Sequence, residues 1–302
     1  MFIQIIGSLQ LGLLYAAMAM GVYITFRILD IADLTVDGSF VTGMATTAVV
    51  GGVINNPLVA ILAGTVAAAL AGLITGLLLT KVKVPAILSG IITMTGLYSI
   101  NMFIMGEKSN VSLVGKDTVF SVFCKASPIN DEFDKLILAL FIAALIAVAL
   151  SVFFKTRPGM AIRATGDNEE MVRSSSINAD VSKCLGLIIA NGCVGLSGSL
   201  ICQYQQFSDV GYGTGMVVIG LASIIIGESI CGKKGIITGI ISACVGSTVY
   251  RIIIALALRF DIFPSYALKL ISAVIVALSI AIPVLKNAIV NAKIKSSRGR
   301  AQ

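Results

Sequence analysis

Residues 38–80 read GSFVTGMATTAVVGGVINNPLVAILAGTVAAALAGLITGLLLT, which is 43 residues without a charged side chain. A helix needs about 20 apolar residues to cross the hydrocarbon core of a membrane, so this stretch is long enough for two. Asn55, Asn56 and Pro57 divide it, and such a turn favours the end of one helix and the start of the next. The stretch therefore predicts a pair of membrane-spanning helices.

The same apolar character extends along the rest of the chain. Seven further runs carry one charge or none: 1–26, 84–106, 136–154, 184–208, 210–227, 235–258 and 265–285. We therefore expect an all-α, polytopic membrane protein of about nine transmembrane helices, within a range of eight to ten, that forms a single transmembrane domain over residues 1–302. The run 210–227 is rich in glycine at its start and is a candidate for a broken or re-entrant span.

The overall composition excludes several classes of protein. The chain has 302 residues, of which 57% are hydrophobic and 12% are charged, whereas soluble domains carry about 25% charged residues. Histidine is absent, which excludes Ser-His-Asp catalysis and His-ligated zinc or haem. The six cysteines form no CxxC pair, so we interpret them as packing residues. We expect neither an enzyme nor a metal or cofactor site.

The distribution of Lys and Arg predicts the orientation. If the basic tail 286–302 is cytoplasmic, the inside segments hold fifteen of the 22 basic residues and the outside segments hold six. Cytoplasmic loops carry such an excess in most membrane proteins. We therefore expect a cytoplasmic C-terminus and an outside N-terminus. The remaining basic residue, Arg251, lies within a span, where we expect it to face protein or an aqueous path, because an Arg facing lipid is costly.

The long inner segment 155–183 contains a short helix signal. Asp167 is a good N-cap, and Glu170 three residues later completes a capping-box pattern. Glu169 and Arg173 are four apart and favour an ion pair on one helix face. The pattern predicts a helix of two or three turns, and it leaves open whether this helix docks into a partner or is part of a solvated loop.

Three acidic residues lie close together before the second span, at Asp30, Asp33 and Asp37. Arg27 is placed to pair with Asp30, and Asp37 is placed to cap the second helix. Acids at a membrane boundary are costly unless they are paired, solvated or capping. The segment around Asp33, Thr35 and Asp37 is therefore either a lining of the translocation path and its inner gate, or a set of helix caps.

Two further glycine patterns have simple interpretations. Gly72 and Gly76 form a GxxxG pair, which favours a close helix contact within one subunit. Residues 227–234 fit the start of a phosphate-binding loop, but Lys234 replaces the Ser or Thr that would bind magnesium. We interpret this second segment as a tight cytoplasmic turn.

Three motifs, in order along the chain, carry a family resemblance. The segments are DIADLTVDGS at 30–39, RATGDNEEMVRSSSIN at 163–178 and IGESICGKKGIITG at 226–239. They resemble an Asp-Leu-Ser/Thr-Val motif, a coupling-helix loop and a Gly-rich turn of ABC importer permeases of the branched-chain amino acid and ribose class. The first of these motifs, at 30–39, is most similar to that of the tryptophan/tyrosine-type subgroup. The resemblance covers nearly the whole chain.

The resemblance implies the function. It implies a permease subunit of an ATP-driven importer in the plasma membrane, working by alternating access on a small, amino-acid-like solute. The implied partners are a cytoplasmic ABC ATPase dimer that binds the ATP, an extracellular substrate-binding (lipo)protein and a second permease copy. The residues implied to contact the ATPase are Gly166, Asp167, Asn168, Glu169, Glu170, Met171 and Arg173. The alternative is an ion-coupled secondary transporter, which would need more ionisable groups within its spans.

Overall fold

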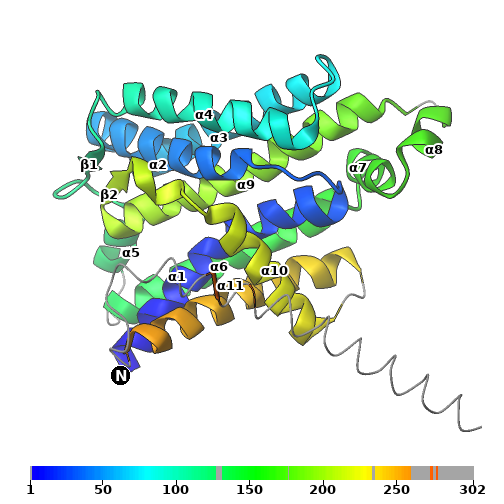
Figure 1. The fold of residues 1–302 in the computed structure, drawn as a ribbon. Coiled ribbons are helices and arrows are strands. Elements are labelled where there is room, and N and C mark those ends of the chain that lie inside the picture. Colours follow the sequence, from blue (N-terminus) through cyan, green and yellow to red (C-terminus); the bar gives the residue numbers. More distant parts are fainter. Residues whose placement is uncertain are drawn as a thin grey trace, which may run out of the picture.

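The computed structural model describes residues 2–126, 131–175, 177–232, 235–259, 273–274 and 277. In these ranges, eight helices are long and apolar enough to cross a membrane (Figure 1). They correspond to α1 (Phe2–Tyr23), α2 (Thr35–Ile54), α3 (Pro57–Thr80), α4 (Ala86–Ile104), α6 (Asp131–Phe153), α9 (Ala179–Gln205), α10 (Met216–Cys231) and α11 (Ile236–Arg259). The span that ends with α10 begins before it, at Val210. The expected all-α membrane fold is confirmed. The expected ninth span and the tail 286–302 lie outside the described residues.

The predicted hairpin turn between α2 and α3 is confirmed. Asn55 adopts a left-handed backbone conformation at the end of α2. The side chain of Asn56 accepts hydrogen bonds from the backbone amides of Leu58 and Val59, and Pro57 begins α3. Asn tolerates a positive φ and caps helix starts well, and Pro suits the first helical position.

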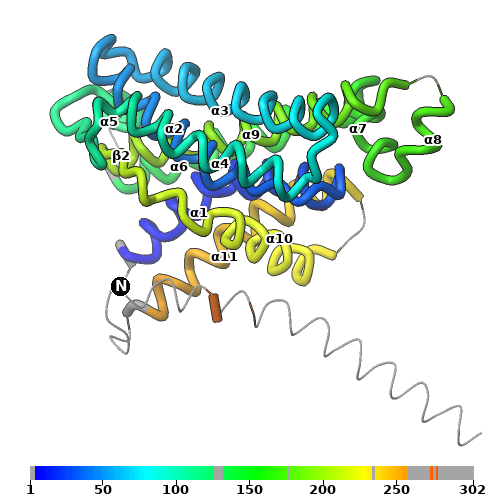
Figure 2. Tube along the Cα trace, turned by 45° about the horizontal axis from the view of Figure 1, so that its top comes forward, coloured from blue at the N-terminus to red at the C-terminus, as the bar shows by residue number. Residues whose placement is uncertain are grey.

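The interior of the bundle is formed mainly by α1 and α9. About 72% of the apolar stretch of α1 and 67% of that of α9 are buried, against 22% for α6. Helix α9 packs against α1, α2 and α3, and α1 also packs against α6, α10 and α11. In Figures 1 and 2, α2, α3 and α4 lie on one side and α10 and α11 on the other. The peripheral helices expose large apolar side chains, as expected for faces that contact lipid.

Small residues permit the closest helix packing. A methyl group added at Gly72 would overlap the carbonyl oxygen of Leu187, and one at Gly76 would crowd Cys184. Both neighbours belong to α9, so the predicted packing role of this GxxxG pair within the subunit is confirmed.

One end of the bundle carries a small irregular layer that the sequence did not predict. Strand β1 (Asn110–Ser112) pairs antiparallel with β2 (Phe207–Asp209), with Val111 opposite Ser208. Helix α5 (Val119–Ala126) lies in the same connection as β1. The 3-10 turn η2 (Val210–Gly213) follows β2, and Gly215 with φ +88° separates it from α10. The Gly-rich seventh run is therefore broken.

At the other end, the segments expected to be cytoplasmic gather together (Figure 1). This end holds the π-helical turn η1 (Ile24–Ile28), and it holds α7 (Arg157–Asp167) and α8 (Glu169–Ser174) between α6 and α9. Figure 2 shows α7 and α8 extending beyond the long helices. The connections expected inside and those expected outside thus lie at opposite ends of the bundle. Which end faces the cytoplasm stays a prediction.

Candidate functional site

Asp33 is almost fully buried and joins the start of α2 to α9. Its Oδ1 accepts a hydrogen bond from the Thr35 amide at 2.9 Å, and its Oδ2 accepts one from Asn191 Nδ2 at 2.7 Å. The Thr35 hydroxyl lies 2.7 Å from the Thr75 hydroxyl of α3. Three elements therefore meet at this buried polar group, and a polar group buried in this way is stabilised by such bonds.

The expected pair between Arg27 and Asp30 is wrong. The Arg27 guanidinium in η1 instead contacts the Glu228 carboxylate near the end of α10, at 2.5 Å. Asp30 has a positive φ of 53° and is exposed. Because the π-helical turn ends at Ile28, the chain leaves the helix before Asp30, and the i,i+3 spacing no longer places the two side chains together.

The expected role of Asp37 as the cap of α2 is also wrong. Helix α2 begins at Thr35, so Asp37 lies within its first turn. Its carboxylate instead accepts hydrogen bonds from the amides of Gly215 and Val217, both at 2.9 Å. These amides are at the N-terminus of α10, where a negative charge is favourable. Asp37 therefore ties α2 to the broken segment before α10.

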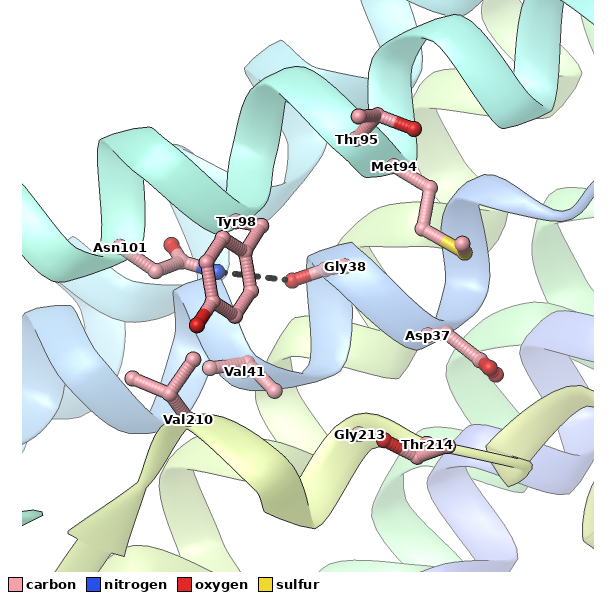
Figure 3. A pocket seen from close by; sticks show the side chains of 10 residues that line it. All are labelled: Asp37, Gly38, Val41, Met94, Thr95, Tyr98, Asn101, Val210, Gly213 and Thr214. Atoms are coloured by element: carbon pink, nitrogen blue, oxygen red, sulfur yellow. Dashed lines mark hydrogen bonds between the residues drawn. The ribbon is translucent and has the colours of Figure 1, made fainter. Parts of the chain in front are cut away.

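A cavity of about 290 Å³ lies beside Asp37. Its walls come from α2, α4 and the η2 segment (Figure 3). The lining residues are Asp37, Gly38, Val41, Met94, Thr95, Tyr98, Asn101, Val210, Gly213 and Thr214. A methyl group at Gly213 would overlap the Asp37 carbonyl oxygen, so only glycine allows η2 to approach α2 this closely. The cavity is mainly apolar with a few polar groups, which is typical of sites for small solutes.

Asn101 fixes the α4 wall of this cavity. Its Nδ2 donates to the Gly38 carbonyl oxygen at 3.3 Å (Figure 3), and the side chain is 1% exposed. Sequence analysis did not single out Asn101 or Asn191. Asn101 is the lone amide of the run 84–106, and Asn191 lies twelve residues before the next amide of its run; intramembrane polar residues of this kind are a signal for interhelical hydrogen bonds.

Arg251 of α11 faces the bundle at Tyr15 of α1. Its guanidinium carbon is 3.7 Å from the centroid of the Tyr15 ring, a cation–π contact. Tyr15 stacks on Phe40 of α2, and Phe40 stacks on Tyr212 of η2. Arg251 is therefore linked through three rings to the segment that lines the cavity.

The inner connection contains two helices where the sequence predicted one. Helix α7 runs through Gly166 to Asp167, so Asp167 ends a helix and does not cap the next one. The cap of α8 is Asn168, whose Oδ1 accepts a hydrogen bond from the Met171 amide at 3.0 Å. The capping box of Asp167 with Glu170 is therefore wrong by one residue.

Ion pairs hold α8 against the start of α9. Glu169 contacts Arg173 at 2.8 Å, which confirms the expected i,i+4 pair, and it also contacts Lys183 at 2.6 Å. Arg173 reaches Asp180 at 2.6 Å. Hydrogen bonds from Lys183 and Arg173 lower the pKa of the Glu169 carboxyl below its ordinary value, so Glu169 stays charged in the folded protein.

The packing of the two short helices separates buried from exposed residues. Val172 is 1% exposed and anchors α8. A methyl group at Gly166 would overlap the Ile28 carbonyl oxygen, so α7 rests directly on η1. Asp167, Asn168, Glu170, Met171 and Arg173 are exposed, and Met171 is an apolar side chain 54% exposed beyond the end of the bundle. Val172 therefore packs inward, whereas these five side chains are accessible at the surface.

Comparison with known proteins gives consistent matches. Residues 4–282 match the family described as branched-chain amino acid transport system, permease component. The chain is 39% identical to a tyrosine transport system permease protein of Clostridioides difficile, over 90% of this chain and 88% of that protein. It is 30% identical to an uncharacterised protein of Rickettsia prowazekii, over 91% and 96%. It is 26% identical to the ribose import permease protein RbsC of Escherichia coli, over 74% and 69%.

Proposed function

Because the chain belongs to the family of permease components of branched-chain amino acid transport systems, we propose that it is the membrane subunit of an ATP-driven importer. In this proposal the chain itself hydrolyses nothing and holds no cofactor. A cytoplasmic ABC ATPase dimer binds the ATP and biases the permease between two arrangements that open to opposite sides.

The observation that carries the proposal is the α7–α8 unit. A preformed helix of six residues, capped by Asn168 and pinned by Val172, extends beyond the bundle and presents Glu170 and Met171. A solvated loop would need neither a buried anchor nor an ion-pair network. A helix that must transmit force to a partner needs both, because a segment that folds on contact absorbs displacement instead of passing it on.

The proposed translocation path includes the cavity between α2, α4 and η2. Asp37 holds the broken segment against α2, and Asp33 and Thr35 form the polar scaffold beneath it. Arg251 supports the same segment through its aromatic contacts. Broken helices beside polar groups recur where transporters bind solutes, because irregular backbone is tolerated there.

The remaining assembly follows from the same assignment. We propose a dimer of two permease copies in the plasma membrane, with an extracellular binding protein that delivers the solute. Residues 155–183 form the cytoplasmic coupling loop of one transmembrane domain, 286–302 form a basic cytoplasmic tail, and the N-terminus lies outside. The substrate is a small, amino-acid-like solute. Support for this class comes from the higher identity to the tyrosine permease than to the ribose permease.

The test is uptake into proteoliposomes. The tagged permease is purified from its native membranes with its bound ATPase and reconstituted with radiolabelled tyrosine and, separately, ribose. We expect ATP-dependent uptake of tyrosine and none of ribose when the binding protein is supplied. Uptake driven by an ion gradient without ATP would overturn the proposal in favour of a secondary transporter, and ATP-dependent uptake of ribose alone would overturn the substrate class.

A further inference from the structure

The π-helical turn η1 lies between the coupling loop and α10 and touches both. On one side, Gly166 of α7 rests on the Ile28 carbonyl, with no room for a side chain. On the other side, Arg27 contacts Glu228 of α10 at 2.5 Å. One turn of five residues therefore bridges two elements that do not follow each other in the chain.

Helix α10 continues this contact to the cavity. Glu228 lies twelve residues after Met216, which is roughly 18 Å along a helix. At the far end, Gly215 and Val217 donate to the Asp37 carboxylate beside the cavity. A displacement of Glu228 along the axis of α10 would act on these two hydrogen bonds, because an intact helix moves as one body.

We propose that Arg27 and Glu228 are positioning residues that pass the movement of the coupling loop to α10, and so to the Asp37 cavity. The inference rests on the proposed function. An ion pair exposed on both sides opens easily by thermal motion. Here the Glu228 side chain is only 9% exposed and that of Arg27 is 42% exposed. Water and salt weaken a partly shielded ion pair less than a fully exposed one, so this contact resists separation.

The differing exposure gives the pair an asymmetry that an experiment can use. Removing Arg27 leaves the buried Glu228 charge without its guanidinium. Removing Glu228 leaves a guanidinium that water can solvate. Arg27→Gln should therefore disturb the protein more than Glu228→Gln, and the double variant Arg27→Gln/Glu228→Gln should be more stable than Arg27→Gln, because a neutral amide replaces the shielded carboxylate.

The experiment measures solute transported per ATP hydrolysed by the permease–ATPase complex in proteoliposomes. We expect Arg27→Glu and Glu228→Arg to retain the bound ATPase and its basal hydrolysis but to lose transport per ATP by at least about fivefold, the low end of coupling between distant sites. The charge-swapped double variant should recover most of it. The matched control is Lys125→Glu, which breaks an ion pair with Asp117 that lies far from η1 and is exposed on both sides.

The neutral double variant separates coupling from folding. It should melt like the parent protein and still transport poorly, because no ion pair joins η1 to α10. Normal transport in this variant, or failure of the charge swap to recover transport in a folded complex, would overturn the relay. Absence of any ATPase in the parent complex would instead overturn the proposed function, so the two failures are distinguishable.

Discussion

At the scale of single residues, the buried acids hold elements together through individual oxygens. Each oxygen of Asp33 accepts one hydrogen bond, from Thr35 and from Asn191. The sequence placed Asp33 either at an inner gate or among helix caps, and no local signal pointed to Asn191, which lies 158 residues away. The pairing depends on how α9 crosses α2, and no local pattern encodes that crossing.

Replacing Asp33 by Asn tests this network. The new amide nitrogen is a donor, and it would face either the Thr35 amide or Asn191 Nδ2, which are donors as well. One buried hydrogen bond is therefore lost. We expect a loss of about 1–3 kcal/mol in the free energy of unfolding, with impaired uptake and retained ATPase binding. The melting temperature of the purified protein and uptake together measure it.

The reciprocal variant Asp33→Asn/Asn191→Asp serves as the control, because it restores a carboxylate opposite an amide. It should recover only part of the lost stability, because Asn191 Nδ2 also donates to the Leu187 carbonyl oxygen at 3.0 Å and a carboxylate cannot. A single variant that melts and transports like the parent protein would show that Asp33 is dispensable.

At the scale of elements, the hydrophobic pattern located the spanning helices and the polar turns but shifted the short helix by one residue. Asp167 and Asn168 are both good caps, so the sequence alone does not decide between them. The structure decides: α7 runs through Asp167, and Gly166 within it packs against the Ile28 carbonyl oxygen. Strands β1 and β2 were missed because three residues carry no recognisable alternation.

The position of the cap is directly testable. Asn168→Ala should destabilise α8 by about 1 kcal/mol, whereas Asp167→Ala, the matched control, should change it little. Hydrogen exchange at the Met171 amide, which bonds to the Asn168 side chain, reports the difference. Faster exchange in the Asp167 variant and unchanged exchange in the Asn168 variant would restore the original capping assignment.

The ion pairs of α8 predict a dependence on pH. The pKa of Glu169 is lowered in the folded protein by Lys183 and Arg173. Its contribution to stability is therefore fully present above the ordinary Glu pKa of about 4.3, and it is lost only as pH falls through the lowered folded value.

We therefore expect ATPase binding to be insensitive to pH between about 5 and 8 as far as this cluster is concerned. Glu169→Gln should weaken binding equally across that range. Binding that falls between pH 7 and 5 in the parent protein but not in Glu169→Gln would contradict the assigned state of this carboxyl.

At the scale of the whole molecule, the separation of loops between two ends was predictable because it follows from the number of spans. Which helices lie inside was not, since the mean hydropathy of the interior helices α1 and α9, at 1.7 and 1.8, is close to the 1.9 of both α10 and α11. The interior position of α1 and α9 depends on small and polar residues at helix crossings, such as Gly72 against Leu187. The role of such residues can be recognised only once the partner helix is known.

The orientation can be measured by cysteine labelling in intact cells. Val114→Cys in the β1–α5 connection should react with an impermeant maleimide, and Ser174→Cys in α8 should react only after permeabilisation, because the Lys and Arg excess places α8 inside. Both positions are exposed. The parent protein, labelled under the same two conditions, gives the background from its own cysteines. The reverse labelling pattern would invert the topology and place α8 on the wrong side for any ATPase.

The central claim, that α8 is the element that an ATPase binds, is tested most directly by site-specific photo-crosslinking in native membranes. A photoreactive amino acid is placed at Met171, or at Phe103, which is 81% exposed on α4 and serves as the control. We expect position 171 to crosslink to an ATP-binding protein identified by mass spectrometry, and position 103 to give no such product. A permease that transports normally while position 171 captures no ATPase would contradict the account.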